Sequence, residues 1–249
     1  MRKIISFSLW GDRDVYNYGT LENVLIAKKL FPGWICQIYH SDNVNTMILE
    51  ILKSLDNVEL IRMEAPQTSN LIEHICGEDR AVYKSCEFWR FMAAFDKKND
   101  VVVVRDVDSR LNPRDRLAID EWLRSDKKFH KVRDNTAHWR HIMGGMWGCK
   151  DGVLCRDDVI KSFENYPKPN KRNMDQYFLR DIIYPIIVND TLTHSSVGAK
   201  RGDTYVKTIP DATGSTLNEG LPDYVCDAHI GACVMQWNIA NDYVKNKII

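Results

Sequence analysis

The chain has 249 residues, 44% of them hydrophobic, and its 34 basic residues balance 34 acidic ones. This length can bury the core of one large α/β domain, and the balanced charge argues against nucleic acid or an anionic membrane as a partner. No stretch approaches the roughly 20 apolar residues that span a bilayer. The seven cysteines contain no Cys-x-x-Cys pair. We therefore expect one soluble, cytoplasmic domain over residues 1–249, with reduced thiols and no integral membrane contact.

Strands and helices alternate through the first hundred residues. Apolar runs predict strands over 4–10, 34–39, 58–63 and 101–104, and periodic apolar positions predict helices over 21–30, 47–55 and 80–95. A polar, aromatic loop over 12–19 is expected to join the first strand to the first helix. This alternation predicts a parallel sheet with right-handed crossovers.

The rest of the chain is less regular. The pattern predicts a helix over 114–125, a strand over 129–132, a glycine-punctuated, strand-like segment over 142–148, and helices over 157–166 and 174–183. The tail from residue 195 is rich in Gly, Thr and Asp and is expected to consist mainly of loops.

Two carboxylates follow a run of four valines, in the sequence Arg105-Asp106-Val107-Asp108. Ligands of open parallel sheets bind at the carboxyl ends of the strands, and carboxylate oxygens suit Mg²⁺ or Mn²⁺, which leave positions open for phosphates. The alternative is an ordinary acidic turn neutralised by Arg105, Arg110 or Arg114, and an Asp-x-Asp motif alone does not decide between them.

Four motifs follow one another along the chain: Asp106-Val107-Asp108, Gly144-Gly145-Met146-Trp147-Gly148, Asp175-Gln176 and Asp227-Ala228-His229-Ile230-Gly231. They resemble those of the GT-A glycosyltransferases, which use sugar nucleotides, and their order is similar to that of the glycogenin and bacterial galactosyltransferase-like branch. The resemblance spans residues 4–231. It implies one α/β domain with a Rossmann-like, mostly parallel central sheet flanked by helices, in which residues 1–110 bind the nucleotide sugar and residues 111–249 bind the acceptor and complete the metal site.

The resemblance implies that Asp106, Asp108 and His229 hold Mn²⁺ (or Mg²⁺) on the donor diphosphate, and that Gly144 and Gly145 border the sugar. Imidazole itself suits Mn²⁺ better than Mg²⁺. A histidine in a loop is also often just a hydrogen-bonded residue, and His194 is the substitute candidate for the third ligand. The chain departs from that branch in lacking an Asn shortly before the glycines and a Lys after the late histidine.

The segment after the first strand offers groups that suit a nucleotide. An aromatic ring, Trp10 or Tyr16, can stack a nucleobase, Asn17 or Asp12 can hydrogen-bond it, and Arg13 can meet a phosphate. The alternative is a polar loop whose aromatic side chains pack on the adjoining helix.

Further donor contacts are expected from the helix over 80–95 and from the acidic motif. In the resembling family a basic residue of this helix meets the donor, which makes Lys84 and Arg90 candidates, and Val107 is grouped with them as a donor-binding residue. Glu87 could also project toward the donor, or could form an internal pair with Arg90 at helical spacing.

The reacting centre is assigned to Asp175, Gln176 and Asp134. The resemblance puts the Asp-Gln pair near the reacting carbon, although Asp175 could simply be an acidic residue favoured at a helix N-terminus. Asp134, at the end of the strand over 129–132, could bind a sugar or act as a general base. Trp139 or Trp147 could stack an acceptor sugar or belong to the core.

These features together predict a metal-dependent glycosyltransferase that moves a hexose from a nucleotide diphosphate sugar to a carbohydrate or glycan acceptor. A haloacid-dehalogenase-type phosphatase is one alternative, because its nucleophile also heads an Asp-x-Asp after an apolar strand, although that strand normally opens the fold. A non-catalytic binding protein of the GT-A fold is the other.

Overall fold

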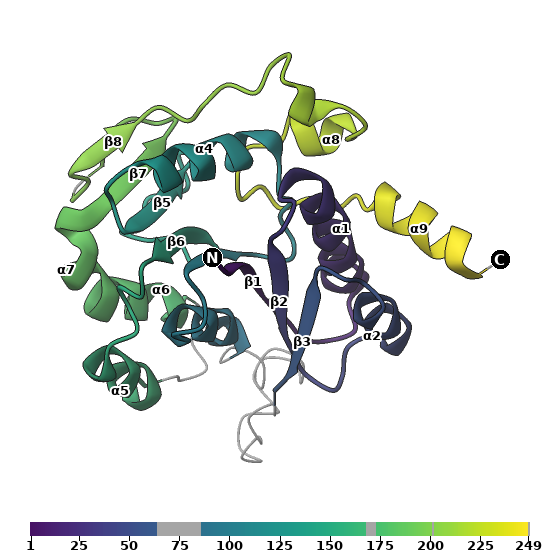
Figure 1. The fold of residues 1–249 in the computed structure, drawn as a ribbon, viewed down its shortest axis with the longest axis horizontal. Helices are drawn as coiled ribbons and strands as arrows, with labels where there is room; N and C mark the ends of the chain where they lie inside the picture. Colours follow the sequence, from purple (N-terminus) through teal and green to yellow (C-terminus); the bar gives the residue numbers. More distant parts are fainter. Residues whose placement is uncertain (64–85, 168–172, 201, 249) are drawn as a thin grey trace.

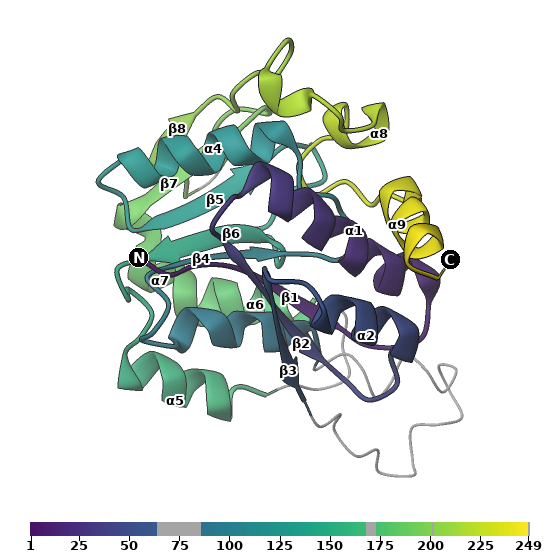
Figure 2. The same cartoon turned by 45° about the vertical axis from the view of Figure 1, so that its right-hand side comes forward.

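An eight-stranded sheet with the order β3-β2-β1-β4-β6-β5-β7-β8 runs through the molecule. In this computed structural model, which describes residues 1–63, 86–167, 173–200 and 202–248, helices cover both faces of the sheet (Figures 1 and 2). Among the described strands, only β6 is antiparallel to its neighbours, β4 and β5. The strands are β1 (Lys3–Leu9), β2 (Ile35–His40), β3 (Val58–Arg62), β4 (Val101–Arg105), β5 (Phe129–Arg133), β6 (Met146–Lys150), β7 (Thr191–Ser195) and β8 (Tyr205–Lys207). The predicted mostly parallel α/β domain is confirmed.

The helices form two layers, one on each face. One layer contains α1 (Asp14–Leu30), α2 (Thr46–Lys53), α4 (Pro113–Arg124) and α9 (Asn238–Ile248), and the other contains the 3₁₀ helix η1 (Cys86–Phe95), α5 (Asp157–Asn165), α6 (Met174–Phe178) and α7 (Tyr184–Ile187). A π-helical turn, Leu179–Ile183, joins α6 to α7, and the short α8 (Asp223–Cys226) precedes α9. None of the described helices is long and apolar enough to cross a membrane.

The valine run forms the central strand β4. Val101 and Val103 face the core under α1 and α2, whereas Val102 and Val104 face the core under η1. A strand with both faces covered needs apolar side chains on both sides, which explains an unbroken run rather than an alternating one. The strand therefore delivers the two aspartates to the sheet edge from a fully packed position.

The structure corrects several predicted boundaries. Helix α1 begins at Asp14, so residues 14–19 are helical and not a loop. The described part of the predicted helix over 80–95 is the 3₁₀ helix η1, and residues 64–85 lie outside the described residues. The tail predicted as loops contains β8, α8 and α9.

Strand β7 was not predicted because its sequence, Thr-Leu-Thr-His-Ser, is mostly polar, yet all five residues are buried. It pairs with β5 and β8, so its backbone groups are satisfied on both sides.

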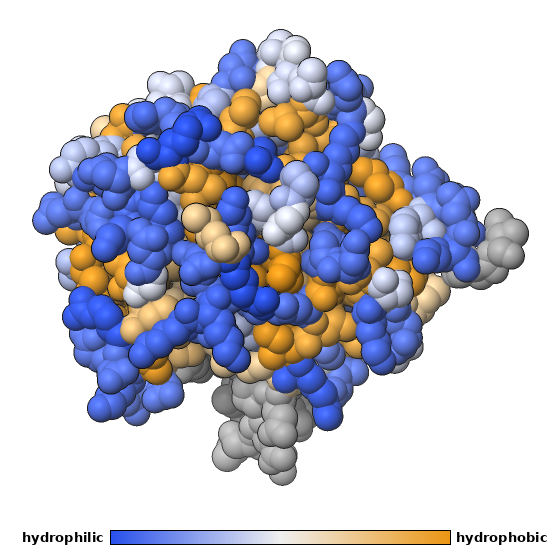
Figure 3. All heavy atoms as spheres, viewed as in Figure 1, coloured by the Kyte–Doolittle hydropathy of each residue, from blue (hydrophilic) through white to orange (hydrophobic). Residues whose placement is uncertain are grey.

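At the surface, the face in Figure 3 shows hydrophilic side chains interspersed with apolar ones.

Candidate active site

A cavity of about 440 Å³ lies at the carboxyl ends of β1 and β4. Its lining comes from six parts of the chain: the end of β1 with the start of α1, η1, the acidic motif after β4, the segment between β5 and the start of β6, the start of α6, and the late segment over residues 231–233. The predicted site residues that line it are Trp10, Tyr16, Arg90, Asp106, Val107, Asp108, Gly144, Gly145, Asp175 and Gln176. Residues far apart in the sequence thus meet where the acidic motif ends β4.

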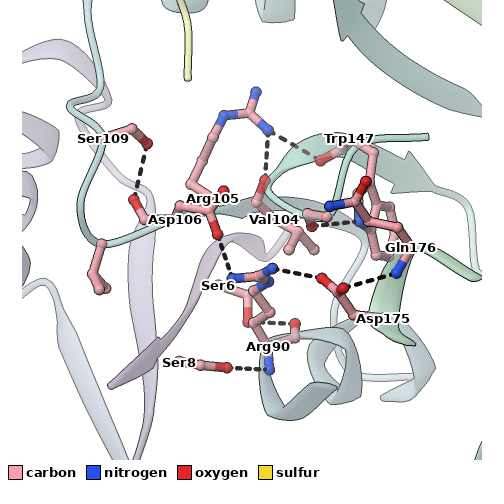
Figure 4. Close-up of polar contacts among 12 residues, drawn as sticks. Ser6, Ser8, Arg90, Val104, Arg105, Asp106, Ser109, Trp147, Asp175 and Gln176 are labelled. Atoms are coloured by element: carbon pink, nitrogen blue, oxygen red, sulfur yellow. Dashed lines mark hydrogen bonds and ion pairs between the residues drawn. The ribbon is translucent and has the colours of Figure 1, made fainter. Parts of the chain in front are cut away.

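Arg90 is the centre of the polar network in this cavity (Figure 4). Its guanidinium forms an ion pair with Asp106 through Nη1 and with Asp175 through Nη2, the latter at 3.0 Å. The side chain is 7% exposed, and although burial opposes the charge, the two carboxylates raise the pKa of Arg90. The arginine therefore joins the acidic motif to α6.

Two hydroxyl groups of β1 fix the backbone that carries Arg90. Ser6 Oγ donates to the Arg90 carbonyl at 2.7 Å, and the Arg90 amide donates to Ser8 Oγ at 2.9 Å (Figure 4). Both serines are buried on the face of β1 toward η1. These two hydrogen bonds attach the middle of η1 to β1.

None of the three arginines closest in sequence to the acidic motif forms an ion pair with it. Arg105 makes a buried bidentate pair with Asp115 of α4, at 2.9 and 2.7 Å, and Arg114 pairs with Asp134 at 2.9 Å. The guanidinium of Arg110 donates to backbone carbonyls. The salt-bridge alternative with these three neighbours is therefore wrong.

The surroundings of Asp108 disfavour its ionised form. Burial and the charge of Asp106 raise its pKa to about 6, and no cation among the described residues forms an ion pair with it. Cys233, brought alongside by a bridge to Ser109, hydrogen-bonds to it through the thiol. Two carboxylates that repel each other at a cavity wall favour a cation between them.

Gly144 and Gly145 make room for acidic side chains. A Cβ at Gly145 would collide with the carboxylate of Asp106, and a Cβ at Gly144 would collide with that of Asp175. The glycines thus allow β6 to begin directly against the Arg90 network. The sequence predicted that another group approaches these glycines closely. The structure shows this approach, and the approaching groups are side chains of the protein itself.

Asp175 and Gln176 open helix α6, after Asn173 in the left-handed conformation with φ 66°. Asp175 is buried, and its Oδ1 accepts from the Gln176 amide at 2.8 Å. Burial raises the pKa of Asp175, and Arg90 offsets this only in part. Asp175 is therefore more than a helix-capping residue, because it also binds a cation from another element.

Glu87 also lines the cavity and hydrogen-bonds to Asp175. Burial and the neighbouring Asp175 raise the pKa of Glu87 to about 8. Two carboxyl groups at hydrogen-bonding distance need a proton between them, so Glu87 is a neutral donor at pH 7. The sequence suggested a pair of Glu87 with Arg90, whereas Arg90 ion-pairs with the two aspartates.

We predict that Glu87→Gln removes a pH dependence of stability. Because the folded-state pKa lies above the unfolded value, the folded protein holds a proton that the unfolded chain releases, and stability falls as pH rises from about 4.5 to about 8. Urea unfolding at pH 5, 7 and 8.5 should show that fall reduced in the variant. Parallel curves for wild type and variant would contradict a protonated Glu87.

Trp10 and Tyr16 form a stacked pair at the cavity, with ring centroids 6.3 Å apart and planes 23° apart. The guanidinium of Arg13 lies 5.3 Å from the Tyr16 ring centroid. The aromatic candidates of the first segment are thus available to a ligand, although Tyr16 comes from helix α1 and not from a loop.

The polar candidates of that segment lie differently. Asn17 is fully buried, and its Nδ2 donates to the carbonyls of Gly11 and Arg13 at 2.9 and 3.0 Å while its Oδ1 accepts from the Asn45 amide. Asp12 and Arg13 are exposed and do not line the cavity. The side chain of Asn17 therefore holds the start of α1 in place.

The histidine expected to complete a metal site is near the cavity but not in its lining. The rings of His229 and His138 lie 5.7 Å apart, and His138 is the one that lines the cavity. Within the described ranges, no three His, Cys, Asp or Glu side chains are already grouped as metal ligands. Asp106 and Asp108 fit a hard divalent cation, and a third ligand would need rearrangement.

His194, the substitute candidate, does not line the cavity. It lies on β7, where its Nδ1 is 2.8 Å from Nε2 of His130 and its Nε2 is 2.9 Å from Glu121. Both histidines are fully buried, and burial lowers the pKa of each. The contacts of His194 with His130 and Glu121 therefore have a structural role where β5 pairs with β7.

We predict that the two buried histidines make the fold sensitive to acid. Their folded-state pKa values lie below the unfolded value of 6.5, so the unfolded chain takes up protons first and stability falls as pH drops below about 6.5. His130 stacks on Trp122, with ring centroids 5.2 Å apart, so His130→Phe keeps an aromatic ring there and should lessen that fall in urea unfolding between pH 7.5 and 5. An unchanged slope in the variant would assign the acid sensitivity elsewhere.

The remaining predicted residues are placed as follows. Asp134 ends β5 as expected, but it is buried outside the cavity lining, where Oδ1 accepts from Arg114 and Oδ2 accepts from the Ile230 amide at 2.9 Å. Lys84 lies outside the described residues. Residues lining the cavity that were not selected from the sequence include Ser8, Glu87, His138, Asn173 and Cys233. Only Glu87 and His138 had a sequence signal, namely a charged or titratable side chain beside a predicted site residue.

No family model matches the chain, and no curated protein matches it. Among solved structures, an active-site variant of LgtC, a galactosyltransferase, is 11% identical over 98% of this chain and 95% of its own, with a TM-score of 0.50. The fold is GT-A. A glycosyltransferase involved in glycosylation of the PBCV-1 major capsid (13% identity, 99% and 100% coverage, TM-score 0.48) and a Pyrobaculum calidifontis mannosyltransferase in complex with GDP-Man and Mn²⁺ (12%, 84% and 57%, 0.48) are also similar.

The GT-A fold bears on the phosphatase alternative. The Asp-x-Asp motif follows β4, the fourth strand along the chain, whereas the phosphatase nucleophile follows the strand that opens its fold. A phosphatase site of that type also needs a later lysine, and one candidate, Lys150, donates to the carbonyls of Leu123 and Ser125 instead. The phosphatase alternative does not fit this topology.

Proposed function

We propose that the protein is a glycosyltransferase that moves a hexose from a nucleotide diphosphate sugar to a carbohydrate acceptor with Mn²⁺ or Mg²⁺. The observation that supports this most is the meeting, in one GT-A cavity, of the Asp106–Asp108 carboxylates, the stacked Trp10–Tyr16 pair and Asp175. These supply groups for a metal-bound diphosphate, a nucleobase and a sugar, respectively.

The donor would lie along the part of the cavity lined by these groups. Trp10 and Tyr16 would stack the base, Asp106 and Asp108 would hold the metal, and His229 is the proposed third ligand. When bound, the metal would neutralise the charge that develops on the departing diphosphate. Arg13, exposed beside Tyr16, is the proposed cation for the outer phosphate.

The sugar of the donor would be bound by α6 and by the glycine segment before β6. Asp175 would accept hydrogen bonds from sugar hydroxyls, held in its orientation by Arg90 and the Gln176 amide. Gln176 would lie beneath the anomeric carbon, and Gly144 and Gly145 would border the ring. Asp134, proposed earlier as a base, here fixes the backbone of Ile230, next to His229.

The test is a screen of nucleotide diphosphate sugars by thermal shift, with Mn²⁺, with Mg²⁺ and with EDTA. A ligand at 100 times its Kd stabilises the folded state by about 2.7 kcal/mol, so a true donor should raise Tm only when metal is present. Donors that pass are then assayed for released nucleoside diphosphate. Absence of any metal-dependent nucleotide binding would favour a non-catalytic GT-A protein, and hydrolysis of p-nitrophenyl phosphate without such binding would favour a phosphatase.

A further inference from the structure

The loop between β5 and β6 presents an exposed tryptophan next in sequence to a residue that lines the cavity. Trp139 is 64% exposed, while its neighbour His138 is buried and lines the cavity. The guanidinium carbon of Arg140 lies 4.1 Å from the Trp139 ring centroid and 5.0 Å from that of Tyr177. Tyr177 follows Gln176, another lining residue. We call Trp139, Arg140 and Tyr177 the rim platform.

The rim platform carries a positive charge that its surroundings leave available. Arg180 also lies against Tyr177, at 4.9 Å, but it is neutralised by a bidentate pair with Asp181 at 2.5 and 2.9 Å. Arg140 has no such partner: across the described ranges, no carboxylate forms an ion pair with it. Arginine in this state readily binds a carboxylate or phosphate, because its planar N–H groups match two oxygens at once.

The stacking also orders the arginine. A guanidinium within about 5 Å of two aromatic ring centroids is held by cation–π attraction, so less side-chain entropy is lost when an anion binds. The indole meanwhile keeps most of its surface exposed, so a ligand can cover it. The apolar C–H face of a pyranose is a natural partner for such a ring.

We propose that the rim platform is an acceptor subsite for an acidic saccharide, with a sugar ring stacked on Trp139 and its carboxylate or phosphate bound by Arg140. The proposal rests on the proposed transferase function. It specifies the class of acceptor. Trp139 follows His138 and Tyr177 follows Gln176 in the sequence, and both His138 and Gln176 line the cavity where the donor sugar would lie. A saccharide bound there could direct a hydroxyl into that cavity.

The experiment measures binding of three probes to the full chain by calorimetry: methyl β-glucoside, methyl β-glucuronide and glucose 6-phosphate. We expect both acidic probes to bind at least about tenfold more tightly than the neutral one, in line with a charge-assisted hydrogen bond. The two acidic arms distinguish a carboxylate from a phosphate as the preferred group. Inorganic phosphate alone serves as the charge-only control.

Variants assign the binding to the platform. Arg140→Gln should remove the preference for the acidic probes and leave the neutral probe unchanged, whereas Trp139→Ala should weaken all three. Arg180→Gln is the matched control, since it removes an arginine that contacts the same tyrosine but is already neutralised. Circular dichroism melting of each variant verifies that the fold is intact.

Equal binding of neutral and acidic probes, no binding of any probe, or equal losses in Arg140→Gln and Arg180→Gln would each overturn the proposal. Binding of inorganic phosphate as tight as that of glucose 6-phosphate would show a simple anion site and would also overturn it. Nucleotide binding with Mn²⁺ is measured separately on the same samples. A protein that binds acidic sugars but no nucleotide would refute the transferase function, and one that binds nucleotide but no acidic sugar would refute only the acceptor subsite.

Discussion

Replacing Asp108 by asparagine should abolish Mn²⁺-dependent nucleotide binding while raising the melting temperature of the metal-free protein. Asparagine keeps the shape of the side chain but loses the negative charge that the metal needs. At the same time it removes a cost, because the pKa of Asp108 is raised to about 6 and the half-buried group is ionised at pH 7. A gain of 1 kcal/mol would raise Tm by about 2–4 °C in a chain of this size.

The gain in Tm from Asp108→Asn should depend on pH. A carboxyl whose folded-state pKa is raised makes the fold less stable as pH rises from the unfolded value, near 3.9, through about 6. The advantage of Asp108→Asn in Tm should therefore be present at pH 7.5 and nearly vanish at pH 4.

Scanning fluorimetry with and without Mn²⁺ and UDP measures both parts. Asp126→Asn, at an 85% exposed carboxylate, is the control and should change neither. If Asp108→Asn still responds to Mn²⁺ and nucleotide as wild type does, Asp108 is not a metal ligand. If it lowers Tm at pH 7.5, the aspartate has a structural partner and the electrostatic argument fails.

Replacing Arg90 by methionine should cost about 3–5 kcal/mol of unfolding free energy, because it leaves two carboxylates facing a cavity without their cation. Arg90 is the described cation that pairs with both Asp106 and Asp175, and its side chain is 7% exposed. Methionine retains much of the apolar stem, so the loss would be mainly electrostatic.

Urea unfolding followed by circular dichroism measures this loss. Arg62→Met, at a pair with Asp42 that is 69% and 65% exposed, is the matched control and should cost less than about 1 kcal/mol. Adding Asp175→Asn to Arg90→Met should recover part of the stability, since one unpaired charge disappears. A double variant no more stable than the single one would show that packing, and not charge, accounts for the loss.

Local pattern was enough for the first half of the fold. The strands β1 to β4 and helix α2 lie within a few residues of their predicted bounds, because apolar runs and helical periodicity report burial directly. The position of the acidic motif at a strand end is also local information, as is the opening of α6 at Asp175. The boundary of α1 was missed because Asp14 to Gly19 looks polar and aromatic, yet several of these residues are buried in the helix.

What the sequence by itself determined is the chemistry available at the end of β4, namely two carboxylates after an apolar strand. Which cation meets them was decided only by tertiary structure. Three arginines stand nearest in sequence, yet Asp115, Asp134 and backbone carbonyls engage them, and the partner of Asp106 is Arg90, 16 residues earlier. Ion pairing depends on distance in space and on burial, and a chain's periodicity encodes burial but not which distant side chains meet.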